Sequence, residues 1–167
     1  TLHKDMGTYL QNLESKYELI CRLKPLLAKQ NGKVTSYEIR DNFLRFWFRF
    51  IYPHQSLIER NLYALLRSNI DNNYEGFSGR TLERYFQDKM WETEHYTQVG
   101  NWWDRKGQNE IDLIAINEFD HTGIIAEIKR NVHKLSMSKL QEKVEALPKK
   151  DFGEYRFELK GLSLKDM

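Results

Sequence analysis

The chain has 167 residues, enough for one ordinary domain or two small ones, and its formal net charge of +2 points to neither a basic nor an acidic partner. It contains no apolar run near the roughly 20 residues that a membrane span needs, and no signal peptide pattern. The single cysteine, Cys21, excludes an internal disulfide and fits a reducing cytoplasm.

The first 39 residues predict a helix followed by a two-stranded hairpin. Apolar side chains three and four residues apart predict the helix over Leu2–Ile20. The strands Cys21–Leu27 and Val34–Ile39 flank Lys29–Lys33, whose Asn-Gly pair favours a tight turn. A helix and such a hairpin form the back half of a winged-helix module. The helix and the basic turn could contact DNA, or the module could pack between domains.

An aromatic helix is expected next. Asp41 is a suitable N-cap for a helix over Asn42–Tyr52, which Pro53 would end. Apolar side chains cover nearly its whole circumference, so we expect it to be buried. Arg45 and Arg49 share its remaining stripe, where salt bridges are commoner than phosphate contacts.

A short amphipathic helix should follow over 57–66, broken at Asp71–Asn73. We therefore expect three parts. They are residues 1–53, with the partial winged helix and the buried aromatic helix; 54–76, a helical connector; and 77–167, an α/β domain.

The last part predicts the order helix, three strands, helix, strand, with one mixed sheet. Ser78 would cap the first helix, which carries Leu82 and Phe86 on its inner face. The remaining elements follow from periodicity and from turn residues. They are strands at 96–103, 110–116 and 124–130, a helix at 137–147 that Pro148 stops, and a strand at 155–160.

Charged residues lie at the ends of the two most apolar strands. The runs Leu113–Ile116 and Gly123–Ala126 are apolar enough to be covered on both faces. Glu127 and Lys129 share a strand face because side chains two apart point the same way. Asp112 enters the neighbouring strand at the same end of the hairpin. These three side chains are the parts of a magnesium-dependent phosphodiesterase.

The pattern Asp112…Glu127-Ile128-Lys129, with Glu83 on the preceding helix, resembles the PD-(D/E)XK nuclease superfamily. Ile111 stands where the signature has proline, a relaxation that many members share. The resemblance implies a restriction-endonuclease-like αβββαβ core, the order that periodicity also predicts.

Three further phrases look like the C-terminal region of archaeal-type ATPases, which also occur in bacteria. The resemblance implies a winged-helix module before a nuclease-like part, and a longer protein whose N-terminal ATPase domain is absent from this chain. The phrases are Y37-E-I-R-D-N-F-L-R-F-W-F-R-F-I-Y-P53, V99-G-N-W-W-D-R105 and E110-I-D-L-I-A115.

The expected cofactor is Mg²⁺ or Mn²⁺. Asp112 and Glu127 supply the oxygen ligands that Mg²⁺ prefers, and the family pattern adds the Ile128 carbonyl. Glu83 would be a third or outer ligand, and Lys129 would position the attacking water or hold the phosphate. Without metal, the three carboxylates should repel one another, with Lys129 alone to offset them. The structural alternative is an ion pair of Lys129 with Asp112 or Glu127.

Candidate nucleic-acid contacts surround this site. From Lys129 to Lys150 the chain has seven Lys or Arg against two Glu. Lys139 and Lys143 lie one helical turn apart, opposite the apolar face, which suits a phosphate backbone or a solvated surface. One of Trp102 and Trp103 should be in the core while the other stacks on a base or packs on a partner. The candidate contacts are Lys139, Lys143, Arg130, Lys134 and Trp102.

No G-x-x-x-x-G-K-[ST] motif is present, so the chain should not bind ATP by itself. Its scattered histidines and one cysteine offer no zinc-ligand set. Two functions remain: a Mg²⁺-dependent DNA endonuclease, and a non-catalytic DNA-binding or protein-interaction module. Both fit a cytoplasmic, ATPase-linked protein, and a homo-oligomer is left open.

Overall fold

The computed structural model describes residues 2–28 and 35–167. Contacts divide them into two units, residues 2–23 with 35–74 and residues 24–28 with 75–167. The boundary falls inside a helix, α4 (Tyr63–Glu92). Each unit is described by itself. No helix within the described residues combines the length and the apolar character needed to cross a membrane.

The first unit opens with the expected helix and strand pair. Helix α1 (Leu2–Gln11) continues into a π-helical turn, η1 (Asn12–Lys16), and ends four residues earlier than predicted. Strands β1 (Ile20–Leu23) and β2 (Ser36–Ile39) are antiparallel, as predicted, and both are shorter than expected. The predicted turn at Lys29–Lys33 lies outside the described residues.

The aromatic helix forms where it was expected. It consists of α2 (Asn42–Phe46) and a π-helical turn, η2 (Trp47–Ile51). The Asp41 carboxylate accepts the Leu44 N–H at 2.8 Å, so the predicted N-cap is confirmed. A 3₁₀ turn, η3 (Tyr52–His54), and α3 (Gln55–Glu59) follow it.

The predicted burial of this helix is wrong. Phe50 is 1% exposed, whereas Phe43 is 66% exposed. An apolar circumference is buried all round only where other elements surround it, and here one stripe is packed. Arg45 pairs with Glu38 at 3.2 Å, with both side chains largely buried, so its salt bridge is confirmed.

The predicted break at Asp71–Asn73 is also wrong, because α4 runs through it for 30 residues. Ser78 is not an N-cap either; it lies within α4 and donates to the Glu75 carbonyl at 3.3 Å. Asp and Asn cost a helix only about 0.7 kcal/mol each, and a helix that is already formed propagates cooperatively through them. The expected connector, 54–76, is therefore not a separate unit.

The second unit is built on a four-stranded mixed sheet in the order β3-β4-β5-β6. Neighbouring strands are antiparallel except β5 and β6, which are parallel. The strands that carry Asp112 and Glu127 are neighbours, as predicted. The bounds are β3 (Gln98–Trp103), β4 (Glu110–Asn117), β5 (Thr122–Ile128) and β6 (Arg156–Leu162).

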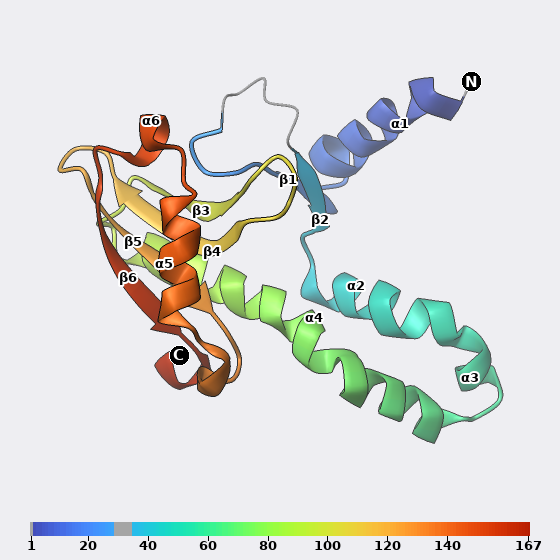
Figure 1. Ribbon diagram of the computed structural model, residues 1–167. Helices are drawn as coiled ribbons and strands as arrows, with labels where there is room; N and C mark the ends of the chain where they lie inside the picture. Colours follow the sequence, from blue (N-terminus) through green and yellow to red (C-terminus); the bar gives the residue numbers. More distant parts are fainter. Residues whose placement is uncertain (1, 29–34) are drawn as a thin grey trace. The chain divides into compact units, whose positions relative to one another are not determined.

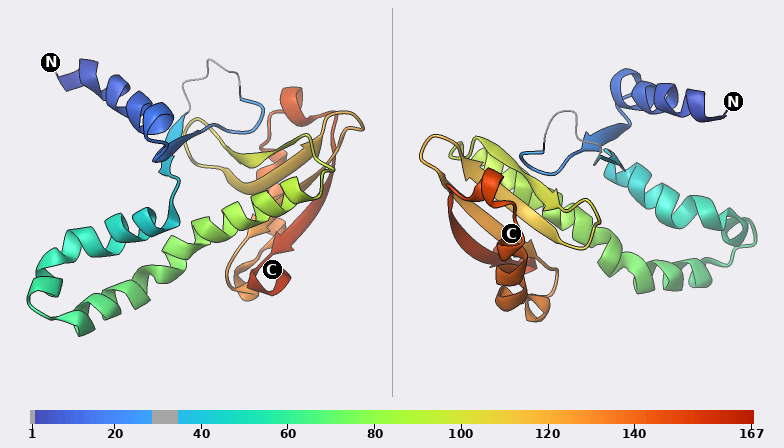
Figure 2. Two further views of the ribbon diagram at one scale, coloured as in Figure 1. Left: turned by 180° about the vertical axis from the view of Figure 1, so that it is seen from behind. Right: turned by 45° about the horizontal axis from the view of Figure 1, so that its top comes forward.

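Helices cover both faces of this sheet, which explains the apolar runs in β4 and β5 (Figures 1 and 2). Helix α4 packs on one face through Leu82 and Phe86, against Leu113 and Ala126. Helix α5 (Met137–Glu145) packs on the other face through Leu140. The order of elements from α4 to β6 is the predicted one, apart from a short additional helix.

That additional helix is α6 (Lys149–Phe152), and two 3₁₀ turns accompany it, η4 (Val132–Lys134) and η5 (Leu164–Asp166). Helix α5 ends at Glu145, two residues before the predicted end at 147, and Pro148 is the N-cap residue of α6. Phe152 of α6 is buried in the same core layer as Leu140. Helix α6 therefore extends the cover of the sheet.

Two glycines give a matched test of this packing. A Cβ on Gly123 of β5 would lie 2.6 Å from the Ala115 carbonyl oxygen and 2.8 Å from the Phe157 ring, whereas a Cβ on Gly76 of α4 would meet nothing within 4 Å. We expect Gly123→Ala to lower the free energy of unfolding by about 1–3 kcal/mol through overpacking. Gly76→Ala should raise it by about 0.5–1 kcal/mol. Urea denaturation measures both, and equal effects would contradict the register of β4, β5 and β6.

Candidate functional site

A β-bulge shapes the strand that carries Asp112. Gly100 of β3 pairs with Ile114 of β4, but Trp102 pairs with Ile111. Two residues of β4, Asp112 and Leu113, therefore oppose one residue of β3. Bulges re-aim side chains and are frequent beside active sites. Here the bulge lets Ile111 and Ile114 enter the same core layer.

Asp112 is buried, with 7% of the residue exposed. One oxygen of its carboxylate accepts two hydrogen bonds. The β4–β5 ladder ends where Leu113 faces Ala126. Just beyond, Asp112 Oδ2 accepts the Ile128 backbone N–H at 2.8 Å and the Lys129 ammonium at 2.9 Å. The side chain thus replaces a ladder partner and holds the two strand ends together.

Glu127 is the second buried carboxylate, with its side chain 7% exposed. Its Oε1 lies 3.5 Å from the Nζ of Lys129 and 3.5 Å from the Nζ of Lys143. Its Oε2 accepts the Ser136 backbone N–H at 3.4 Å. Ser136 is the N-cap of α5. One carboxylate therefore joins the end of β5 to helix α5.

The Lys129 ammonium lies among three oxygen atoms. It is 2.9 Å from Asp112 Oδ2, 3.2 Å from the Ile128 carbonyl oxygen and 3.5 Å from Glu127 Oε1. Burial alone would lower the pKa of Lys129, but the hydrogen bonds and charges of Asp112 and Glu127 outweigh it and raise that pKa. Lys129 is therefore a cation, and it contacts the oxygens of Asp112, Glu127 and Ile128 that were predicted as metal ligands.

Glu83, on α4, has its own partner. Arg80 is 2.9 Å from Glu83 and 3.0 Å from Glu110. Burial raises the pKa of Glu83, the hydrogen bond from Arg80 opposes that rise, and the charge of Asp112 adds to it. The charge of Asp112 thus affects the pKa of Glu83, while the Glu83 carboxylate accepts its hydrogen bond from Arg80.

The structure brings together Asp112, Glu127, Lys129 and the Ile128 backbone, as the sequence pattern predicted. Over residues 2–28 and 35–167, no group of three or more His, Cys, Asp or Glu is placed to hold a metal ion. The sequence predicted Lys143 as a phosphate contact on the outer face of its helix and did not predict its contact with Glu127. The sequence did contain a sign of this contact, because Lys143 follows the apolar Leu140 by three residues and so lies at the edge of the buried face of its helix.

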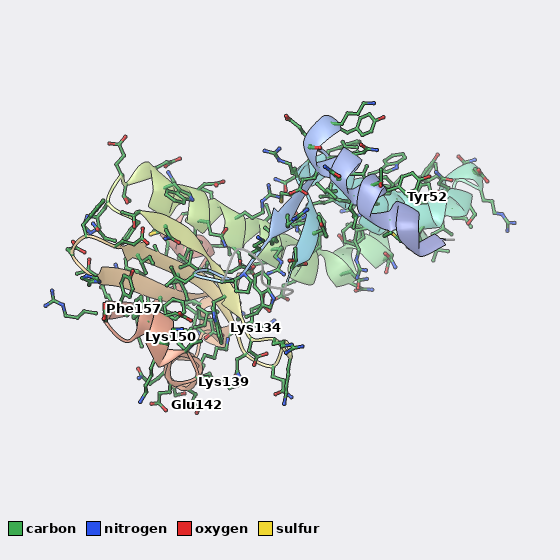
Figure 3. The ribbon with its side chains drawn as sticks, turned by 90° about the horizontal axis from the view of Figure 1, so that it is seen from above. Tyr52, Lys134, Lys139, Glu142, Lys150 and Phe157 are labelled. Carbon is green, nitrogen blue, oxygen red and sulfur yellow. The ribbon has the colours of Figure 1, made fainter. Side chains whose placement is uncertain are left out.

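The other nucleic-acid candidates occupy different surroundings. Lys139 is exposed and projects from α5 away from the sheet (Figure 3). Lys134 pairs with Glu75 of α4 at 2.6 Å, and Arg130 donates to the Ser78 hydroxyl. These two contacts tie the segment after β5 to α4.

Trp102 must be removed from the candidate contacts. It is 7% exposed and packs in the core layer with Ile111 and Ile114. A base could not stack on its ring, and Trp103, its neighbour, is the partly exposed one of the pair. The expectation that one of the two tryptophans lies in the core is confirmed.

Comparison with known proteins places the chain among sequences without an assigned activity. A family model described as "DUF234: Archaea bacterial proteins of unknown function" matches residues 47–144. An uncharacterized protein of Methanocaldococcus jannaschii is 33% identical over 132 residues, which cover 76% of this chain and 29% of that protein. The chain therefore spans less than a third of this relative. No solved structure matches it.

The raised pKa of Glu83 predicts a stability effect with a definite sign. A carboxyl whose pKa is raised by folding destabilises the folded state while it is ionised, so that cost is present at neutral pH and disappears as the pH falls through the raised pKa. Glu83→Gln should raise the free energy of unfolding at pH 7 by up to about 1 kcal/mol. The gain should shrink as the pH falls through the raised pKa and be absent below the ordinary glutamate pKa of about 4.3.

Glu75→Gln, on the same helix, is the matched control. Lys134 lowers the pKa of Glu75 through a hydrogen bond and its charge, so the effect at pH 7 should have the opposite sign. Chemical denaturation with a chelator present measures both variants. A Glu83→Gln protein that is less stable than the parent at pH 7 would contradict the electrostatic description of this carboxylate.

Proposed function

The chain belongs to the DUF234 family, described as archaea bacterial proteins of unknown function, and we propose that its second unit is a Mg²⁺-dependent DNA endonuclease of the PD-(D/E)XK type. It would hydrolyse phosphodiester bonds as the C-terminal part of an ATPase-linked, cytoplasmic protein. The observation that carries the proposal is the cation position that Lys129 fills, between Asp112, Glu127 and the Ile128 carbonyl.

These residues fit a magnesium ion. Two carboxylates and one carbonyl are hard oxygen donors, and Mg²⁺ uses one or two carboxylates and keeps several waters. The three oxygens already surround a positive charge in this structure. Asp112, Glu127 and the Ile128 carbonyl would hold the ion. When bound, it would stabilise negative charge on the phosphate and acidify a bound water.

The protein's own groups are arranged for an exchange of cations. Lys129 holds the oxygens that the metal ion requires, so its ammonium must leave them, and the flexible lysine stem allows that. Asp112 keeps its hydrogen bond from the Ile128 N–H, and Glu127 keeps the one from Ser136. Both carboxylates therefore stay oriented while Lys129 moves to the phosphate or to the attacking water.

The fold supports the same proposal. A helix, three strands, a helix and a strand, with the site at the neighbouring ends of β4 and β5, is the order that the PD-(D/E)XK core has. The helix and antiparallel strand pair of the first unit support a winged-helix remnant. Lys134 and Lys139 on the segment after β5 would contact the DNA backbone. The ATPase portion would lie in sequence beyond these 167 residues.

One observation favours the second function, a non-catalytic DNA-binding or protein-interaction module. The expectation that Lys129 alone offsets the carboxylates is wrong, because Lys143 also contacts Glu127, and Arg80 pairs with Glu83. Asp112 and Glu127 are thus balanced by two ammonium groups. Such a cluster could serve to hold α5 against the sheet, without any chemistry.

The response of stability to metal distinguishes the two functions. An ion that binds only the folded state stabilises it, by about 2.7 kcal/mol at a hundredfold excess over its dissociation constant. We expect millimolar Mn²⁺ or Mg²⁺ to raise the melting temperature, and Asp112→Asn to abolish the rise. Asp120→Asn, in the turn at the other end of β5, should leave the rise intact. Differential scanning calorimetry measures each shift.

The metal-free Asp112→Asn protein should itself be less stable than the parent, by about 1–3 kcal/mol, because two donors lose a charged acceptor. Its stability without metal therefore does not decide between the functions. If neither ion changes the melting temperature of the parent protein, the contacts of Lys129 with Asp112 and Glu127 are structural ion pairs.

Cleavage is the direct test. With Mg²⁺, the parent should nick supercoiled plasmid or branched DNA. Lys129→Met should reduce the rate by at least about 100-fold, the usual effect of losing a group that stabilises transition-state charge. Lys89→Met, on the exposed side of α4, should retain the rate within about threefold. A metal response without nicking of either DNA would favour the binding module.

A further inference from the structure

We propose that Lys143 belongs to the substrate subsite: with Lys129 it forms a two-ammonium site that binds the phosphate once a divalent cation is on the carboxylates. The inference rests on the proposed function and adds a residue to it. The sequence pattern had placed Lys143 on an outer stripe with Lys139. The structure places its ammonium at Glu127 instead.

The two ammonium groups converge on one atom. Each Nζ lies 3.5 Å from Glu127 Oε1, one reaching it from the end of β5 and the other from α5. Their side chains are 34% and 27% exposed, whereas Glu127 is 7% exposed. The Glu127 carboxylate is therefore buried beneath the two lysines, and both ammonium groups retain access to solvent. A ligand arriving from solvent would meet the two lysines first.

Helix α5 fixes Lys143 in this place. The helix begins at the Ser136 N-cap, whose N–H also donates to Glu127, and Leu140 is fully buried under it. Lys143 follows Leu140 by three residues, so it lies close to the same face. Long side chains on a helix lean toward its N-terminus, which carries the ammonium back toward Glu127. Lys139, one turn earlier, is exposed (Figure 3).

Charge balance explains why an anion would bind here. Asp112 and Glu127 carry two negative charges, which Lys129 and Lys143 balance. A divalent cation on both carboxylates neutralises them and leaves two neighbouring ammonium groups without counter-charge. Two like charges in a partly buried position are unfavourable, and a phosphate with its negative oxygens relieves them. Cation and phosphate should therefore bind with positive coupling.

Sulfate can serve as the tetrahedral anion probe and Mn²⁺ as the cation. Isothermal titration calorimetry would measure Mn²⁺ affinity in chloride and in sulfate at matched ionic strength. For the parent we expect sulfate to tighten Mn²⁺ binding about tenfold, within the usual range of coupling between sites. Lys143→Met should reduce that factor to below about threefold. In chloride, its Mn²⁺ affinity should equal or exceed that of the parent, since a repelling charge is gone.

Three further variants sharpen the result. Lys143→Arg keeps the charge and should keep most of the coupling. Lys89→Met, on the exposed side of α4, should keep the sulfate coupling of the parent. Lys143→Gln should repeat the Lys143→Met result, which guards against a folding defect in a single variant, and circular dichroism melting checks each protein.

The outcomes separate this inference from the proposed function. Full coupling in Lys143→Met and Lys143→Gln, or an equal loss in Lys89→Met, overturns the role of Lys143 and leaves the metal site standing. Failure of the parent to bind Mn²⁺ in either salt overturns both.

Discussion

The second unit depends on the neutralisation of two buried carboxylates at one end of its sheet. An unpaired buried charge costs several kcal/mol, so Asp112 and Glu127 require the partners that surround them. Asp112 finds a backbone N–H and an ammonium, and Glu127 finds two ammonium groups and the N–H of Ser136. These contacts join β4, β5 and α5. The fold and the candidate site therefore depend on the same few hydrogen bonds and ion pairs.

A buried ion-pair cluster is a poor way to gain stability. Well-packed apolar residues of similar volume often do as well or better. The sheet around Asp112 is otherwise apolar, with Ile111 and Leu113 fully buried on either side of it. A cluster that consists only of structural contacts would be easy to replace in such a core. Packing alone therefore does not explain why the two carboxylates are buried here.

The first unit presents a different surface. Phe43, Phe48 and Tyr52 are exposed on the aromatic helix, although its composition suggested burial on every side. The similar protein of Methanocaldococcus jannaschii is more than three times as long as the stretch that it shares with this chain. The second unit, in contrast, contains its own core and its own site.

Local sequence determined much of this protein. The apolar runs of β4 and β5 predicted their pairing, and the Asp41 cap predicted the start of α2. The spacing of Glu127 and Lys129 predicted that their charges lie together at the end of β5. Each of these signals extends over only a few residues. The 30-residue α4 could not be predicted in this way, since its Asp and Asn positions read as a break and the cooperativity of the long helix overrode them.

Nor could sequence show which lysine reaches Glu127. Lys139 and Lys143 are alike in type and one turn apart on α5. The buried Leu140 sets the rotation of that helix against the sheet, and so brings Lys143 to Glu127 while Lys139 stays in solvent. The orientation of a helix depends on contacts between residues that are distant in the chain, and it exists only once the core has formed.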